Sequence, residues 1–209
     1  GIVDRPALVV QTCRGLDVVA PETGEPLLRG APEWAQRTSN NNAVFPKVYQ
    51  GSLLFMHGSA GLSKVSRKGD NWTEEWLCAD LVYDRGNWFT FNRQVIRGKY
   101  LYALAGAGKG RGGRLSCVNL DTGAIEWTRP EQFGNLLLAA DKLMIVTEMG
   151  EIAWGALEGN QYNETFRQKL LNGGVEADTD GPYWSHPVLH DGHLYVRSNK
   201  GKLTCFRVE

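Results

Sequence analysis

Residues 95–127 read VIRGKYLYALAGAGKGRGGRLSCVNLDTGAIEW and contain one complete four-stranded unit. Short runs of aliphatic and aromatic residues alternate with turn residues, which is typical of antiparallel strands joined by tight connections. Gly98 turns the first strand into the second, and Asp121-Thr122-Gly123 turns the third into the fourth. The expected strands are residues 95–96, 100–105, 114–119 and 124–127. The stretch therefore predicts one blade of a β-propeller.

Weaker copies of this unit lie on both sides of it. The turns that open the second strand fall at Gly51, Gly98, Asp141 and Gly192, at intervals of 47, 43 and 51 residues, which is the period of propeller blades. Five blades result, at approximately residues 1–29, 43–77, 93–128, 135–169 and 184–209. The first blade lacks its first strand and the last blade lacks its fourth. Outside the central blade, the expected strands are 7–11, 16–20, 25–28, 43–49, 52–57, 62–66, 73–77, 136–139, 142–147, 151–156, 162–169, 184–189, 193–198 and 202–207.

Composition excludes several classes of protein. The chain has 209 residues, 42% of them hydrophobic, with 23 Lys and Arg balanced by 23 Asp and Glu. This balance gives no electrostatic reason to expect a nucleic acid or an anionic membrane surface as a partner. No apolar run approaches the roughly 18 residues of a membrane span, so we expect no membrane insertion. The four cysteines show no CxxC spacing, so no zinc site is predicted.

The turn motifs carry a resemblance to a known family. Residues 115–127, LSCVNLDTGAIEW, resemble the LxALDxxTGxxxW signature of the PQQ-binding-like, quinoprotein-dehydrogenase-like β-propeller repeats. Residues 16–28 repeat it with Thr23-Gly24 in register. Residues 186–196 and 201–206 are similar to the last blade of bacterial members. The chain departs from the signature at the position where the signature has Asp, most clearly at Asn119 and Ala20. Only the first and third blades keep the Thr-Gly pair.

The resemblance implies an all-β fold in which residues 1–209 form a single propeller segment of about five blades. It implies a larger ring of seven or eight blades, whose missing upstream blades would be partners of this segment. A closed ring of five blades is the alternative, because the first and last blades lack complementary strands. The resemblance also implies an exported protein, periplasmic or secreted.

Two functions are compatible with this family. The first is a non-enzymatic scaffold in the bacterial envelope that presents a loop-rich face to a protein, peptide or glycan, with no cofactor expected. The alternative is a fragment of a PQQ-dependent quinoprotein alcohol dehydrogenase, which would bind PQQ with calcium. The chain has no adjacent pair of cysteines, and no metal ligand or catalytic base can be assigned in it. We therefore favour the scaffold and predict no catalytic, cofactor-binding or metal-binding residue.

The loop-rich face gives the candidate binding residues. In an up-and-down blade, the loops between second and third strands emerge on the same face as the connections between blades. That face would carry three tryptophans of the connections and two cations of the glycine-rich loop 106–114, namely Trp34, Trp88, Trp184, Lys109 and Arg111. The glycine-rich loop is not a phosphate loop, because a strand rather than a helix follows it.

Two further groups have structural explanations. His190 and His193 flank a two-residue turn and would lie opposite each other, but no carboxylate converges with them, so a metal site is not predicted. Cys117 and Cys205 occupy the same position of the third strand in two blades. We expect both to be buried small residues.

Overall fold

A computed structural model describes residues 6–12, 15–28, 45–57, 61–68, 71–79, 81, 94–106, 108, 110 and 112–208. The described residues form strands and connections, without a helix. No helix among them could therefore be long and apolar enough to cross a membrane. The chain divides into two compact units, Gly1–Thr90 and Phe91–Glu209.

The first unit contains two antiparallel sheets in which each strand pairs with the next one in sequence. The strands of the three-stranded sheet are β1 (Leu8–Thr12), β2 (Gly15–Val19) and β3 (Pro26–Leu28). The strands of the four-stranded sheet are β4 (Lys47–Tyr49), β5 (Ser52–His57), β6 (Gly61–Lys68) and β7 (Asn71–Cys78).

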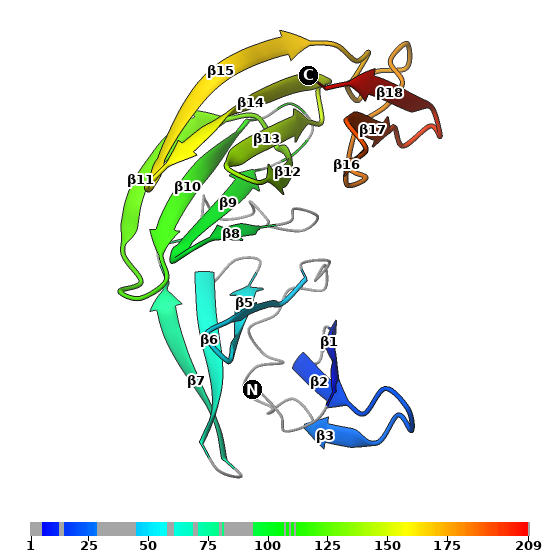
Figure 1. The fold of residues 1–209 in the computed structure, drawn as a ribbon. Helices are drawn as coiled ribbons and strands as arrows, with labels where there is room; N and C mark the ends of the chain where they lie inside the picture. Colours follow the sequence, from blue (N-terminus) through cyan, green and yellow to red (C-terminus); the bar gives the residue numbers. More distant parts are fainter. Residues whose placement is uncertain are drawn as a thin grey trace. The chain divides into compact units, whose positions relative to one another are not determined.

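The second unit contains three sheets of the same antiparallel type, whose strands Figure 1 shows side by side. The first consists of β8 (Val95–Arg97), β9 (Tyr100–Gly106), β10 (Gly113–Asn119) and β11 (Ile125–Glu131). The second consists of β12 (Gly134–Ala139), β13 (Lys142–Thr147), β14 (Glu151–Glu158) and β15 (Gln161–Lys169). The third consists of β16 (Val188–His190), β17 (His193–Arg197) and β18 (Leu203–Arg207).

The strand order agrees with the expected succession of antiparallel strands. Several strand bounds differ by one or two residues, and two larger differences have reasons in backbone chemistry. The strand expected at 124–127 is longer, because β11 continues through Pro130 to Glu131. It is the outermost strand of its sheet, where a residue without an N–H is tolerated. The strand expected at 184–189 is shorter, since β16 begins only at Val188. Pro187 cannot donate to a ladder and restricts the residue before it.

The two Thr-Gly turns have the same hydrogen bonds, which explains the repeated motif. Gly123 N–H donates to Asn119 O at 2.8 Å, and Gly24 N–H donates to Ala20 O at 2.8 Å. Both glycines have a positive φ, 74° and 71°, a conformation that favours glycine. In each turn the threonine hydroxyl accepts the N–H of the residue two positions later. The match between these two sites confirms the register used to align the blades.

Apolar side chains fill the space between neighbouring sheets within each unit. In the second unit, Tyr102 and Cys117 pack in one cluster with Leu143 and Ile145 of the next sheet. A second cluster joins β12–β15 to β16–β18. In the first unit, Val18, Leu53, Phe55 and Val65 form the cluster between its two sheets. Burial of these faces is the main stabilising contribution to the stacked sheets.

The cysteines follow this packing, with one correction to the sequence prediction. Cys117 is buried as expected, but Cys205 is exposed. The prediction was wrong for Cys205 because it lies on the exposed face of β16–β18, and it is the opposite face that packs against β12–β15.

We expect iodoacetamide to modify Cys205 at least about a hundredfold faster than Cys117 in dilute solution. Burial raises the pKa of the Cys117 thiol to about 12, so the folded chain favours its neutral form. That stabilisation is present below the unfolded-state pKa of about 8.5 and is lost as pH rises towards 12. Peptide mass spectrometry after timed labelling measures both rates. Equal labelling of the two thiols would contradict this packing.

Candidate binding face

One end of the second unit gathers its long connections. The topology places the loop between β9 and β10, the turn between β13 and β14, and the connection between β15 and β16 at the same ends of their sheets. Hydrogen bonds between these segments confirm that they meet. We call this end the loop face and define it by residues 106, 108, 110, 112–113, 148–150, 170–187 and 198–202.

Glu148 lies at the centre of the loop face. It directly follows β13 and is fully buried. Its Oε1 accepts the backbone N–H of Gly110 at 2.7 Å, and its Oε2 accepts the indole N–H of Trp184 at 2.9 Å. A buried carboxylate is stable only when its oxygens are hydrogen-bonded. Glu148 therefore ties the glycine-rich loop to the connection that carries Trp184.

Backbone hydrogen bonds reinforce the position of Glu148. Its N–H donates to Phe133 O at 2.8 Å, and its carbonyl accepts the N–H of Tyr183. Gly150 O accepts the N–H groups of Leu170 at 3.1 Å and Leu171 at 3.0 Å. A Cβ at Gly150 would overlap the backbone of Leu171, so the close approach of the two segments requires glycine there.

The connection between β15 and β16 is held against the turn between β17 and β18. The Lys200 ammonium donates to the carbonyl oxygens of Ala177, at 2.9 Å, and Thr179. The Lys202 ammonium lies 2.9 Å from the carboxylate of Asp180. The exposed part of this connection therefore has a defined shape, although it contains no regular strand.

Asn135 also binds the connection between β15 and β16. It is buried at the start of β12, and its Nδ2 donates to the carbonyls of Tyr183 at 3.2 Å and Ser185 at 3.3 Å. Burial raises the pKa of the Tyr183 hydroxyl, and the carboxylate of Asp180 adds to this shift. These groups fix the backbone on both sides of Trp184.

Trp184 is the predicted face residue that the structure describes. Its side chain is half-buried, on the loop face as predicted, but it precedes β16 instead of beginning a strand. The predicted residues Trp34, Trp88, Lys109 and Arg111 lie outside the described residues. Sequence reasoning missed Glu148, and its signal was an acidic residue directly after the apolar strand 142–147.

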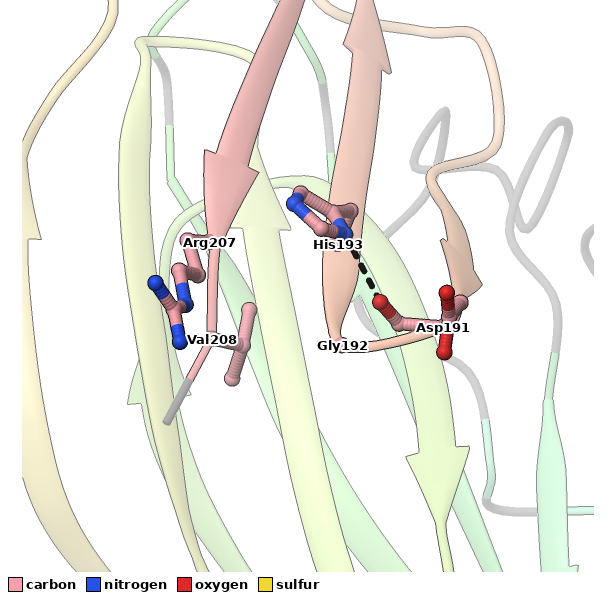
Figure 2. A pocket seen from close by; sticks show the side chains of 5 residues that line it. All are labelled: Asp191, Gly192, His193, Arg207 and Val208. Atoms are coloured by element: carbon pink, nitrogen blue, oxygen red, sulfur yellow. Dashed lines mark hydrogen bonds between the residues drawn. The ribbon is translucent and has the colours of Figure 1, made fainter.

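The opposite end of the third sheet carries the histidine hairpin. His190 and His193 are paired across the Asp191-Gly192 turn, as predicted. The Nδ1 atom of His193 lies 2.7 Å from the carbonyl oxygen of Asp191, and Figure 2 shows this contact in an open hollow bordered by Arg207. The described part of the chain contains no group of three His, Cys, Asp or Glu side chains placed to hold a metal ion.

Comparison with known proteins defines the fold. No protein-family profile matches the sequence, and no curated protein matches it. Among solved structures, BamB from Moraxella catarrhalis has a TM-score of 0.53 at 12% identity, over 98% of this chain and 70% of BamB. Quinohemoprotein alcohol dehydrogenase from Comamonas testosteroni has a TM-score of 0.62 at 9% identity, over 96% of this chain and 41% of the dehydrogenase.

A chain in the complex of S. cerevisiae Dbp5 with Nup159, Gle1, IP6 and ADP has a TM-score of 0.60 at 10% identity. This match covers 96% of the present chain and 55% of the other. These structures, together with the antiparallel sheets, show that the chain has a β-propeller fold. At these identities the similarity concerns the fold alone.

Proposed function

We propose that this protein is a non-enzymatic β-propeller scaffold of the bacterial envelope whose loop face binds a protein or peptide. The observation that carries the proposal is the pair of hydrogen bonds by which the buried Glu148 joins Gly110 to Trp184. Loops held in one arrangement lose little conformational entropy when a partner binds.

The surface of the loop face supports a macromolecular partner. Val175 is an exposed apolar residue, and the carboxylates of Glu176 and Asp178 lie close to it in sequence on the same connection. An apolar contact point bordered by charges is typical of a protein interface. The Dbp5 complex also shows that a structure containing a similar fold can consist of several bound proteins. The placement in the envelope rests on the sequence resemblance.

The test is capture of proteins from a bacterial envelope extract by the immobilised chain and two variants. Val175→Asp adds a carboxylate at the loop face and should weaken capture at least about tenfold. Ala140→Asp adds the same group at the opposite turn, where φ is already 53° and Asp is tolerated, and should leave capture unchanged. Equal loss with both variants would contradict the proposal. Recovery of polysaccharide instead of protein would assign the face to a glycan.

The alternative function, a PQQ-dependent dehydrogenase, requires a cofactor site. PQQ with calcium would supply the redox chemistry, but the residues present do not fit the arrangement that the resemblance implies. The sequence lacks adjacent cysteines, and the described residues lack a cluster of three metal-binding side chains. We assign no residue to this cofactor. Gel filtration with PQQ and calcium tests it, because a quinone absorbance that co-elutes with the chain would favour the dehydrogenase.

A further inference from the structure

A row of cross-strand neighbours forms the contact between the first two sheets of the second unit. Val95, Tyr102, Cys117 and Trp127 lie opposite one another on β8, β9, β10 and β11. Tyr102 and Cys117 are fully buried, and the whole row packs in one cluster with residues of β12–β15. This row therefore marks the sheet face that receives the next sheet.

The third sheet repeats this row, and Val188 and Cys205 at its two ends are exposed. Val188, Tyr195 and Cys205 lie opposite one another on β16, β17 and β18, with the same side chains in the same order. Val188 is 55% exposed and Leu203, on the same face, is 64% exposed. The residue that corresponds to Leu203 by register is Leu115, which is fully buried. We call this surface the trailing face.

The residues that cover the first row show what the trailing face should bind. In β12–β15, the covering residues include Leu143, Ile145 and Ala153. The register of the strands and Thr-Gly turns places Leu8, Val10 and Asp17 of β1 and β2 at the corresponding positions. Leu8 is 54% exposed and Val10 is 39% exposed. We call this second surface, which likewise exposes apolar side chains, the leading face.

The two faces also carry complementary charges at corresponding positions. Arg197 of the trailing face replaces Leu104, and Asp17 of the leading face replaces Ala153. Leu104 and Ala153 belong to the same buried cluster. Arg197 and Asp17 form no ion pair with another described residue. In a contact between the two faces, Arg197 and Asp17 would therefore form an ion pair at the place where Leu104 and Ala153 lie in the buried cluster.

We propose that the trailing face of one copy binds the leading face of a second copy, with Arg197 paired to Asp17. The contact joins two different surfaces, so it is heterologous and leads to chains or closed rings of copies. The proposal is independent of the loop face, since it uses neither Glu148 nor the connections around Trp184.

The test is the mass of the 209-residue chain in solution, measured by light scattering over a range of concentrations. The wild-type mass should rise with concentration. Asp17→Arg and Arg197→Asp should each weaken this association at least about tenfold, because each places like charges together. A one-to-one mixture of the two variants should associate again, since each mixed contact pairs an acid with a base.

A control and a second measurement keep the test decisive. Arg67→Asp on β6 reverses a charge outside both faces and should associate like the wild type. Iodoacetamide labelling of Cys205, which lies on the trailing face, should slow as wild-type concentration rises. A wild-type chain that remains monomeric would overturn the proposal. A one-to-one mixture that associates as weakly as either single variant would also overturn it, because Arg197 of one copy would then not pair with Asp17 of another.

Discussion

Arg167→Ala should lower the free energy of unfolding by about 2–3 kcal/mol and the melting temperature by about 5–10 °C. Arg167 on β15 contacts three carboxylates: Glu131 at 2.7 Å, Glu164 at 2.7 Å and Glu151 at 3.2 Å. The side chain of Glu131 is only 3% exposed and belongs to β11 of the neighbouring sheet. The substitution leaves this carboxylate with Arg129, at 3.3 Å, and with the backbone N–H of Gln132, at 2.9 Å.

Thermal unfolding measures this effect, and two variants control it. Lys64→Ala removes a single ion pair to the exposed Glu75 and should cost less than about 1 kcal/mol. Arg167→Lys keeps the charge but loses the planar fork, so an intermediate loss is expected. If Arg167→Ala were no more destabilising than Lys64→Ala, the charged cluster would not join the two sheets as described.

The pH dependence of the same variant has a definite sign. Hydrogen bonding to Arg167 holds the pKa of Glu164 below its ordinary value, against the opposing effect of burial. This stabilisation is present above the unfolded-state pKa of about 4.3 and is lost as pH falls through the lower folded-state value. The stability difference between wild type and Arg167→Ala should therefore shrink in acid.

Glu148→Ala should loosen the loops of the loop face while lowering the stability of the whole chain only moderately. The substitution removes two hydrogen bonds to a carboxylate, worth about 1.5–3 kcal/mol each, but also removes the cost of burying that charge. Gly110 is exposed and Trp184 is half-buried, so water can reach their N–H groups afterwards. We expect a net loss of about 1–2 kcal/mol in chemical denaturation, together with weaker capture of the envelope partner.

Glu148→Gln keeps the shape of the side chain but changes its hydrogen bonding, so it separates the two contributions to stability. Both partners of Glu148 are donors, whereas an amide offers one acceptor oxygen and one donor group. The glutamine can therefore satisfy only one of the two contacts, and its stability should be at least as low as that of the alanine variant. A glutamine variant as stable as the wild type would contradict the two-acceptor role.

The repeated parts of the fold could be predicted from the sequence, because their signals are local. The runs 52–57 and 142–147 are apolar enough to define β5 and β13 with their observed bounds. Thr23-Gly24 and Thr122-Gly123 specify a turn by backbone conformation and side-chain hydrogen bonding.

The centre of the loop face could not be predicted in the same way. Glu148 contacts Gly110 and Trp184, which lie 38 and 36 residues away in sequence. No spacing rule links residues on three different connections. The exposure of Cys205 was also missed, because its sequence position is equivalent to that of the buried Cys117 and only the neighbouring sheet distinguishes them.

The most direct test of the loop face is hydrogen exchange at two N–H groups, followed by NMR in the wild type and in Glu148→Ala. In the wild type, the Gly110 amide and the Trp184 indole should both exchange slowly although they lie near the surface, and in the variant both should exchange at least about tenfold faster. Amides of β13, such as Ile145, serve as the internal reference and should change little. Fast exchange of the Gly110 amide in the wild type, equal to that in the variant, would contradict the claim that Glu148 joins these loops into one face.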